Sequence, residues 1–233
     1  MISDRAIRAA LDQFRLAVPA DSAPWPTHLE IVLDASLSMT SGDGSKEQRA
    51  RELSILLLRL SESTGLGGCV CVTRGTGRNR VVEPADLAKL ALVPFDGVQP
   101  LGDAWENQLS DRAASTWRVI VSDFLFPGDP LLLVEKAAAG TAKLWLVHLL
   151  DEWELHPSPG GASSLVDIET DQSVELVLDQ VAVDGYVARL TALRDGLADA
   201  CRTVAASWIS VSAATELDEL CGQHLVPAGL LVK

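Results

Sequence analysis

Hard oxygen donors recur at every second position after the first apolar run of the sequence. Asp34, Ser36 and Ser38 follow the segment 29–33, whose Leu, Ile and Val residues are typical of a buried strand. Alternate side chains of an extended chain point to the same side, so the three oxygens can face one point. Carboxylate and hydroxyl oxygens of low total charge suit Mg²⁺. The spacing therefore predicts a divalent-cation site, with Mn²⁺ and Ca²⁺ as alternatives to Mg²⁺.

A second carboxylate follows a later strand in the same manner. The apolar segment 118–122 is also predicted to be a buried strand, and Asp123 comes directly after it. In an open sheet of parallel strands, ligands bind at the carboxyl ends of the strands, where the strand order reverses. We therefore expect Asp123 to lie near Asp34.

The elements that must position these residues alternate between strand and helix. The predicted strands are 29–33, 68–73, 118–122, 143–149 and 208–212, and the predicted helices are 46–63, 84–91, 102–113, 130–139 and 183–206. Alternation of this kind indicates a mainly parallel sheet with helices on both faces. Ser45 and Asp129 are the predicted N-caps of their helices. The predicted fold class is α/β, a doubly wound and mostly parallel sheet.

Two segments interrupt this alternation. Val81 and Val82 follow a glycine-containing turn and are predicted to form a short edge strand, while 165–170 and 174–178 are predicted to form a hairpin. The expected organisation is an N-terminal helix and lead-in over 1–26, followed by one domain over 27–233 that carries the hairpin as an insertion at 163–179.

The charge balance argues against a polyanionic partner. The chain holds 32 Asp and Glu against 19 Lys and Arg, a formal net charge of -13. Nucleic-acid binding needs clustered basic residues that displace counterions from phosphates, and the sequence contains no such stripe. We therefore expect no nucleic-acid partner.

The sequence also carries no pattern of a membrane protein or a secreted one. Its apolar runs fall far short of the ~20 residues that a membrane span requires. Charges at Asp4, Arg5 and Arg8 interrupt the first helix, unlike the apolar core of a secretion signal. The four cysteines lack the spacing of a zinc motif and are expected to be buried, reduced thiols. We expect a cytoplasmic protein.

No familiar catalytic pattern accompanies the oxygen donors. The sequence contains no phosphate-binding P-loop, no G-x-S-x-G nucleophile elbow and no H-E-x-x-H pair. An aspartate after a first strand is also how haloacid-dehalogenase-type phosphatases begin, but these enzymes need a second acid two residues later as general acid. Ser36 occupies that position and is poorly suited to the role. We expect no enzyme, with a Mg²⁺-dependent phosphohydrolase as the weaker alternative.

The motif Asp34-Ala35-Ser36-Leu37-Ser38-Met39 resembles the metal-ion-dependent adhesion site of von Willebrand factor A domains. Val121-Ser122-Asp123 resembles the family's fourth strand, and the loop 97–104 resembles its G-G-T-P-L-G-D-A loop. The hairpin, the long helix 183–206 and the closing strand resemble a bacterial branch that is typically encoded beside MoxR-type AAA+ ATPases.

This resemblance implies an antiparallel edge strand and a Mg²⁺ ion held by Asp34, Ser36 and Ser38, with Asp123 acting through water. Where the family has a threonine ligand, this chain has Gln99, which makes the site partly degenerate. The glutamine carbonyl is also a hard oxygen donor, but it has a longer stem.

The expected function is a non-enzymatic protein-binding module. An acidic side chain of a protein partner would complete the metal coordination, and the resemblance suggests an adaptor for a MoxR-type AAA+ ATPase. The alternative is a metal-free interaction scaffold, in which Asp34 and the two serines only cap the following turn. In that case the segment 151–156, which contains Trp153, is a candidate docking patch.

Overall fold

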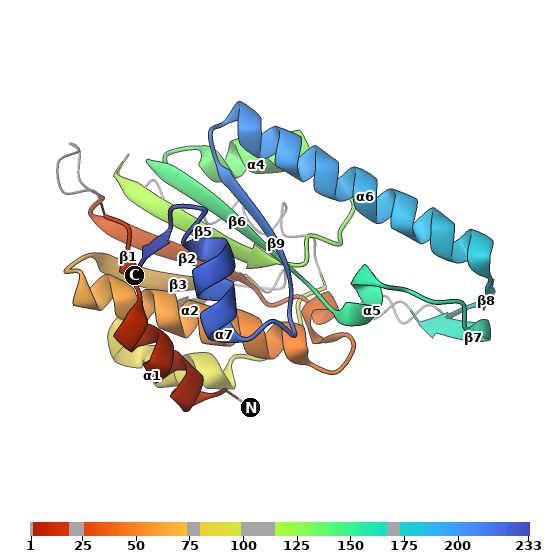
Figure 1. Ribbon diagram of the computed structural model, residues 1–233, viewed down its shortest axis with the longest axis horizontal. Helices are drawn as coiled ribbons and strands as arrows, with labels where there is room; N and C mark the ends of the chain where they lie inside the picture. Colours follow the sequence, from red (N-terminus) through yellow and green to blue (C-terminus); the bar gives the residue numbers. More distant parts are fainter. Residues whose placement is uncertain (1, 19–25, 74–79, 99–114, 167–172) are drawn as a thin grey trace.

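The computed structural model describes residues 2–18, 26–73, 80–98, 115–166 and 173–233. In this part of the chain, six strands form one sheet in the order β4-β3-β2-β5-β6-β9 (Figure 1). The strands are β2 His28–Asp34, β3 Gly67–Thr73, β4 Arg80–Val82, β5 Thr116–Ser122, β6 Lys143–Leu150 and β9 Ser207–Ser212. β4 runs antiparallel to β3, and the other neighbours pair in parallel. The predicted doubly wound α/β class with one antiparallel edge strand is therefore confirmed.

Helices cover both faces of this sheet. They are α1 Asp4–Gln13, η1 Leu37–Thr40, α2 Ser45–Ser63, η2 Pro84–Leu92, α4 Pro130–Ala138, α5 Glu152–Leu155, α6 Gln180–Thr203, α7 Leu217–Glu219 and η3 Leu220–Leu225. Figure 1 shows α4 and α6 on one face and α1, α2 and α7 on the other. Among the described helices, none combines the length and apolar composition that a membrane span requires.

The central strands are buried on both faces, which explains their nearly continuous apolar sequence. Leu29, Ile31 and Leu33 of β2 point into the core cluster that contains the apolar stripe of α2. Val32 of β2 and Ile120 of β5 point the other way, into the cluster formed with α4 and α6. A strand packed on both sides is held rigidly, so the residues at its end are well placed to form a site.

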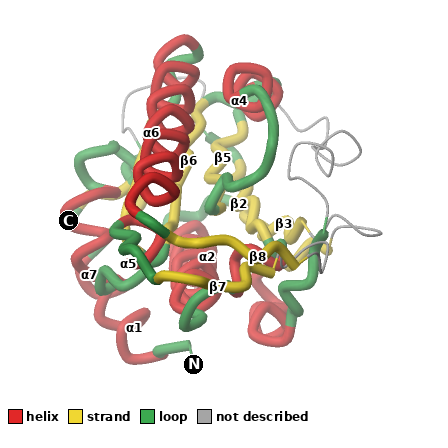
Figure 2. Tube along the Cα trace, turned by 90° about the vertical axis from the view of Figure 1, so that its right-hand side faces the viewer, coloured by secondary structure: helices red, strands yellow, loops and turns green. Residues whose placement is uncertain are grey.

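The strand order reverses at β2. β3, which follows β2 in the chain, pairs with one edge of β2, and β5 pairs with the other. This is the switch point at which open α/β sheets bind ligands. Asp34 ends β2 and Asp123 follows β5, so both lie at this point. Figure 2 looks toward the side of the molecule that carries α5 and the hairpin.

The first and last segments of the chain pair with each other and pack into the same hydrophobic core. β1 (Arg15–Leu16) pairs antiparallel with β10 (Leu231–Val232). Ile7 of α1 is fully buried in the core cluster that includes Leu220 of η3. The sequence did not predict this pairing, because two-residue strands have too few residues to show a period.

Several local predictions need correction. Gly44, at φ +79°, is the N-cap of α2, whereas Ser45 is the first helical residue and its hydroxyl donates to Asp151 at 2.8 Å. The segment 84–92 is a 3₁₀ helix, and α6 begins at Gln180 with Asp179 as its N-cap. The predicted N-cap Asp129 is confirmed, since its side chain accepts the Leu131 N–H.

The predicted hairpin is confirmed with an earlier start. β7 (Gly161–Val166) pairs antiparallel with β8 (Ser173–Leu178). Its first strand begins four residues before the predicted Leu165, at Gly161 with φ +75°. The predicted helix 102–113 lies outside the described residues.

Candidate metal-ion site

The carboxylate of Asp34 is fixed between the ends of β2 and β5. Its Oδ1 accepts the backbone N–H of Ser36 at 2.9 Å, and its Oδ2 accepts the Ser122 hydroxyl at 2.6 Å. Only 3% of Asp34 is exposed. The two hydrogen bonds hold the carboxylate at the end of β2, while each oxygen retains a second lone pair that can accept a further bond.

The two serine hydroxyls form the next part of the site. Ser36 precedes η1 and Ser38 lies within it, and their Oγ atoms are 3.0 Å apart. In octahedral coordination at about 2.1 Å, adjacent oxygen ligands lie about 3.0 Å from each other. The two hydroxyls form a hydrogen bond at this distance, which equals one edge of a Mg²⁺ octahedron, so an ion would replace that bond without moving the oxygens apart. Ser38 is half-buried, so this edge is reached from outside.

Asp123 lies opposite, on a strained turn. Phe124 has a positive φ of 51°, and its N–H donates to the Ser122 hydroxyl at 2.9 Å. Asp123 Oδ1 accepts the Leu125 N–H at 3.2 Å. A bulky residue with positive φ is uncommon and marks a backbone held by its surroundings. The turn holds the Asp123 carboxylate close enough to Asp34 for its charge to act on that residue.

Repulsion between the two aspartates supports a cation at this place. Burial, and then the nearby charge of Asp123, raise the pKa of Asp34 to about 6. Its hydrogen bonds from Ser122 and Ser36 oppose this shift. A divalent cation would remove the repulsion and stabilise both ionised carboxylates. The donor set thus fits the predicted ion in chemistry and in spacing.

Lys46 is the main residue that sequence reasoning missed. The side chain is fully buried, and its Nζ donates to Asp123 Oδ2 at 3.0 Å and to Glu154 Oε1 at 2.7 Å. Burial alone would lower the pKa of Lys46, but the two carboxylates outweigh it and raise the pKa above its ordinary value. Lys46 is therefore an internal cation beside the site. Lysine is rarely fully buried, so its position in the helix gave no reason to predict this role.

Glu154 comes from the short helix after β6. Asp151 caps α5, and Glu154 returns a bond to the cap by accepting the Asp151 N–H at 2.7 Å. Burial raises the pKa of Glu154, and Lys46 acts against that shift. The spacing Asp151-Glu152-Trp153-Glu154 is that of a capping box, a signal that could have placed a helix here.

The candidate docking patch 151–156 is therefore only partly a surface. Asp151 and Glu154 are buried beside the strand ends, so these two acidic side chains are not available for docking as the sequence suggested. Trp153 is 55% exposed and stacks with Tyr186 of α6, with ring centroids 6.0 Å apart. A hollow of about 410 Å³ lies beside these two rings.

The side chains near the strand ends carry an excess of negative charge, which a divalent cation would reduce. Among the described residues at the strand ends, the buried carboxylates of Asp34, Asp123, Asp151 and Glu154 outnumber the Lys46 ammonium by three. Gln99, the remaining predicted ligand, lies outside the described residues. The chain just before it does reach the site, because Gly97 forms a parallel bridge with Ser36.

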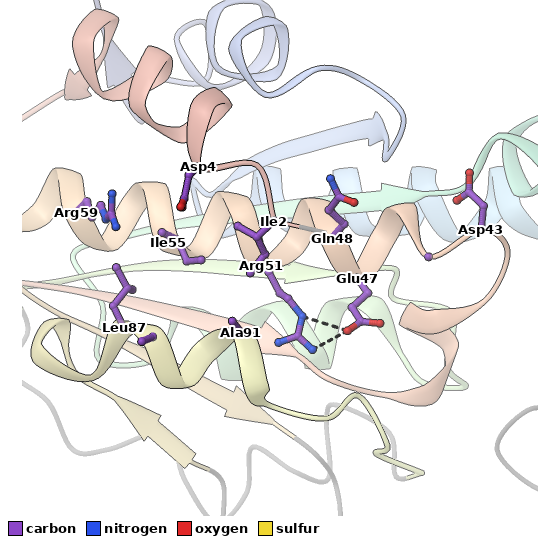
Figure 3. Close-up of a pocket in the computed structure, with 12 residues that line it drawn as sticks. Ile2, Asp4, Asp43, Glu47, Gln48, Arg51, Ile55, Arg59, Leu87 and Ala91 are labelled. Atoms are coloured by element: carbon purple, nitrogen blue, oxygen red, sulfur yellow. Dashed lines mark hydrogen bonds and ion pairs between the residues drawn. The ribbon is translucent and has the colours of Figure 1, made fainter.

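A larger cavity, of about 750 Å³, lies along α2, and its lining includes residues that hold neighbouring elements together (Figure 3). Arg51 lines it and pairs with Glu47 at 2.6 Å, as Figure 3 shows. The same guanidinium donates to the Val93 carbonyl at 2.5 Å and lies over the Phe95 ring, 4.5 Å from its centroid. Arg51 therefore links α2 to the end of η2 and to the loop that follows it.

Comparisons with known proteins support the fold. No family model matches the chain, and no curated protein matches it. An aerotolerance-related membrane protein from Bacteroides fragilis, with multiple mutations to serines, matches at 13% identity and a TM-score of 0.50, over 86% of this chain and 99% of that one. The conserved hypothetical protein BatB from Bacteroides thetaiotaomicron matches at 12% identity and a TM-score of 0.49, over 87% and 98%. At this level of identity, the chain shares an α/β fold with the Bacteroides fragilis protein.

Proposed function

We propose that this chain is a non-enzymatic protein-binding module that uses a divalent ion of the adhesion-site type. The observation that supports this most strongly is the Ser36–Ser38 hydroxyl pair, 3.0 Å apart, beside the buried carboxylate of Asp34. Asp34, Ser36 and Ser38 would hold Mg²⁺, and Asp123 would act through water. The Gln99 carbonyl is the proposed ligand from the neighbouring loop. Mn²⁺ and Ca²⁺ offer the same hard-cation chemistry.

The partner in this proposal supplies the last ligand as an acidic side chain. Protein ligands of low total charge leave Mg²⁺ with residual positive charge and with open coordination positions. A carboxylate from another protein would occupy one of these open positions and bind the ion directly, opposite the protein's own ligands. The hollow beside Trp153 and Tyr186 offers an apolar contact near the ion, since Glu154 of the same short helix borders the charged cluster.

The partner class follows from the resemblance to the bacterial branch encoded beside MoxR-type AAA+ ATPases. We propose an adaptor role for the chain with such an ATPase. The expected result is that a purified MoxR-type ATPase binds the chain in Mg²⁺ and releases it in EDTA. Binding that is equal in both conditions would contradict the metal-dependent form of the proposal.

Calorimetry with a small probe tests the chemistry directly. Mg²⁺ is titrated first, and then a short peptide with one glutamate is added, with the same peptide carrying glutamine as its control. We expect the glutamate peptide to bind only with Mg²⁺, and expect Asp34→Asn to abolish both steps. Equal binding of the two peptides, or binding unchanged in Asp34→Asn, would refute the site.

A metal-free scaffold is the second candidate, and Lys46 favours it. Its ammonium already supplies a buried positive charge to Asp123 and Glu154. In that case, partner binding would survive EDTA and be lost in Trp153→Ala, because the exposed indole would then make the main contact.

A Mg²⁺-dependent phosphohydrolase is the weaker alternative. Its nucleophile would be Asp34, but Ser36 occupies the place of the general acid and is poorly suited to that role. We propose that the chain does not hydrolyse phosphate esters. Mg²⁺-dependent turnover of p-nitrophenyl phosphate that is lost in Asp34→Asn would overturn this.

A further inference from the structure

A group of thiol and carboxylate side chains lies on the sheet, away from the strand-end site. Glu30 of β2 pairs in register with Cys69 of β3 on one side and with Arg118 of β5 on the other. Cys71 lies two residues beyond Cys69, on the same face of β3. The three potential ligand atoms of Glu30, Cys69 and Cys71 all lie within 4.8 Å of one another.

The separations match those of a tetrahedral metal centre. The Sγ atoms of Cys69 and Cys71 are 3.9 Å apart, and Cys71 Sγ lies 3.6 Å from Glu30 Oε1. In a tetrahedral site with a Zn–S bond of about 2.3 Å and a Zn–O bond of about 2.0 Å, the expected separations are roughly 3.8 Å for S···S and roughly 3.5 Å for S···O. The side chains are therefore already close to the arrangement that the ion requires.

Arg118 orients the carboxylate of this group. Its Nε donates to Glu30 Oε2 at 2.7 Å, which leaves Oε1 directed at Cys71. Arg118 is itself anchored, because its Nη1 donates to the Ala137 carbonyl at 2.5 Å. Both Glu30 and Arg118 are only 1% exposed. Metal ligands are commonly positioned by a second hydrogen bond of this kind.

The charges balance with and without an ion. Without it, the Glu30 carboxylate is paired with the Arg118 guanidinium, and the two thiols are neutral. When Zn²⁺ binds, each thiol loses its proton to solvent and forms a Zn–S bond, so two thiolates compensate the two positive charges of the ion. No electron is transferred, and the buried group keeps its formal charge.

We propose that Cys69, Cys71 and Glu30 form a structural or regulatory Zn²⁺ site on this face of the sheet. Thiolates with one carboxylate are zinc ligands, while Mg²⁺ prefers oxygen donors alone. His28 borders Cys69, with its Nε2 3.4 Å from Cys69 Sγ, but its ring nitrogens do not belong to the group of ligand atoms that lie within 4.8 Å of one another, so a water molecule is the proposed fourth ligand. The ion would join β2 and β3, next to the strand that ends in Asp34.

Cys69 and Cys71 could alternatively form a disulfide bond with each other. Residues i and i+2 of a strand have Cα atoms about 6.6 Å apart, near the upper limit for a disulfide bridge. All four cysteines of the chain are reduced thiols in the structure. The strand geometry therefore favours a shared metal ion over a bridge between Cys69 and Cys71.

The test is a Zn²⁺ titration of the reduced chain, with Co²⁺ as the spectroscopic probe. With excess Mg²⁺ present to occupy the strand-end site, we expect one Zn²⁺ or Co²⁺ ion per chain and the intense visible absorption of tetrahedral Co²⁺ with thiolate ligands. Cys69→Ala and Cys71→Ala should each weaken Zn²⁺ binding by about 100-fold or more. Cys201→Ala, which removes a buried thiol elsewhere, is the matched control and should bind as the wild type does. Unchanged binding in the Cys69→Ala/Cys71→Ala double variant would overturn the proposal.

A measurement on the wild-type chain covers the case in which a variant fails to fold. Cys71 is half-buried and should react with iodoacetamide, as peptide mass spectrometry can show. We expect Zn²⁺ to protect Cys71 from alkylation and excess Mg²⁺ to leave it reactive. Equal alkylation with and without Zn²⁺ would refute the site. Asp34→Asn should keep Zn²⁺ binding, so a failure of the adhesion-type site is distinguishable from a failure of this one.

Discussion

At the scale of single residues, Asp34 differs from most carboxylates because its ionised form lowers the free energy of unfolding. Its pKa is raised to about 6 from 3.8, so the folded chain holds a proton more tightly there than the unfolded chain does. Stability contributed by this residue therefore falls as pH rises from about 4 to about 6. A shift of roughly two units corresponds to about 3 kcal/mol. A residue that costs folding energy at neutral pH is typical of a functional site.

Asp34→Asn should therefore stabilise the metal-free chain. The substitution removes the buried charge but keeps the shape, so we expect about 1–3 kcal/mol of extra unfolding free energy in EDTA above pH 6. Urea unfolding at a series of pH values measures it. The gain should shrink toward pH 4, where Asp34 of the wild type is itself protonated. A gain that does not depend on pH would contradict the assigned cause.

Lys46→Met should have the opposite effect. It leaves the buried Asp123 and Glu154 without their shared cation, and breaking a buried ion pair from one side costs about 3–5 kcal/mol. Lys89→Met is the matched control, because Lys89 makes an exposed pair with Asp86 that is worth at most about 1 kcal/mol. Thermal unfolding of both variants checks this. Similar losses in the two would show that Lys46 is not a structural ion in the site.

The sequence could predict the residues whose types reveal their chemistry. Asp34 and Asp123 each follow an apolar strand pattern, and the structure brings Asp34, Ser36 and Asp123 to one place. Ser38 lies in the 3₁₀ helix η1, so its position beside Ser36 does not come from the extended chain that the alternation predicted. Lys46 is different, because its partners come from elements 77 and 108 residues away in the chain. The local sequence pattern around Lys46 contains no information about contacts with residues so far away in the chain.

At the scale of elements, the loop between β2 and α2 depends on close backbone packing. Gly42 has φ +74°, and a Cβ added there would lie 2.1 Å from Asp151 Oδ2. Gly44 has a similar φ of +79°, with nothing within 4 Å of its added Cβ. Both glycines therefore adopt a left-handed backbone conformation, but only at Gly42 would an added Cβ collide with a neighbouring side chain.

This pair permits a controlled substitution. Gly44→Ala should cost about 1 kcal/mol from its left-handed backbone alone. Gly42→Ala should cost more, by about 1–3 kcal/mol, because Asp151 must move and its bond from Ser45 is disturbed. Denaturant unfolding compares them. Equal losses would show that Asp151 does not fix this loop.

The long elements could be predicted and the short ones could not. α2, α6 and the buried strands have enough residues to show a helical or apolar pattern, and their bounds lie near the predicted ones. The sequence placed Cys221 in a helical pattern but gave no bounds for η3 (Leu220–Leu225) or α7, since each contributes only a turn or two of chain. Their helical form is stabilised by packing against the core and not by local sequence.

At the scale of the whole molecule, the chain ends stabilise the sheet that carries the site. Ile7 of α1 is fully buried with the residues that follow β9, so Ile7→Ala should cost about 2–5 kcal/mol. Val181→Ala, at a position that is 78% exposed, should change stability by less than about 0.5 kcal/mol. Unfolding of both variants checks the contrast. A small loss at Ile7 would show that α1 is only peripheral to the core.

The central claim is that the ends of β2 and β5 together hold a hard divalent cation. Its most direct test is a crystal grown with Mn²⁺, in which anomalous scattering locates the ion. We predict a peak within bonding distance of the Asp34, Ser36 and Ser38 oxygens, and no such peak in Asp34→Asn crystals grown the same way. Wild-type crystals without a peak at these oxygens would contradict the claim and leave only the fold.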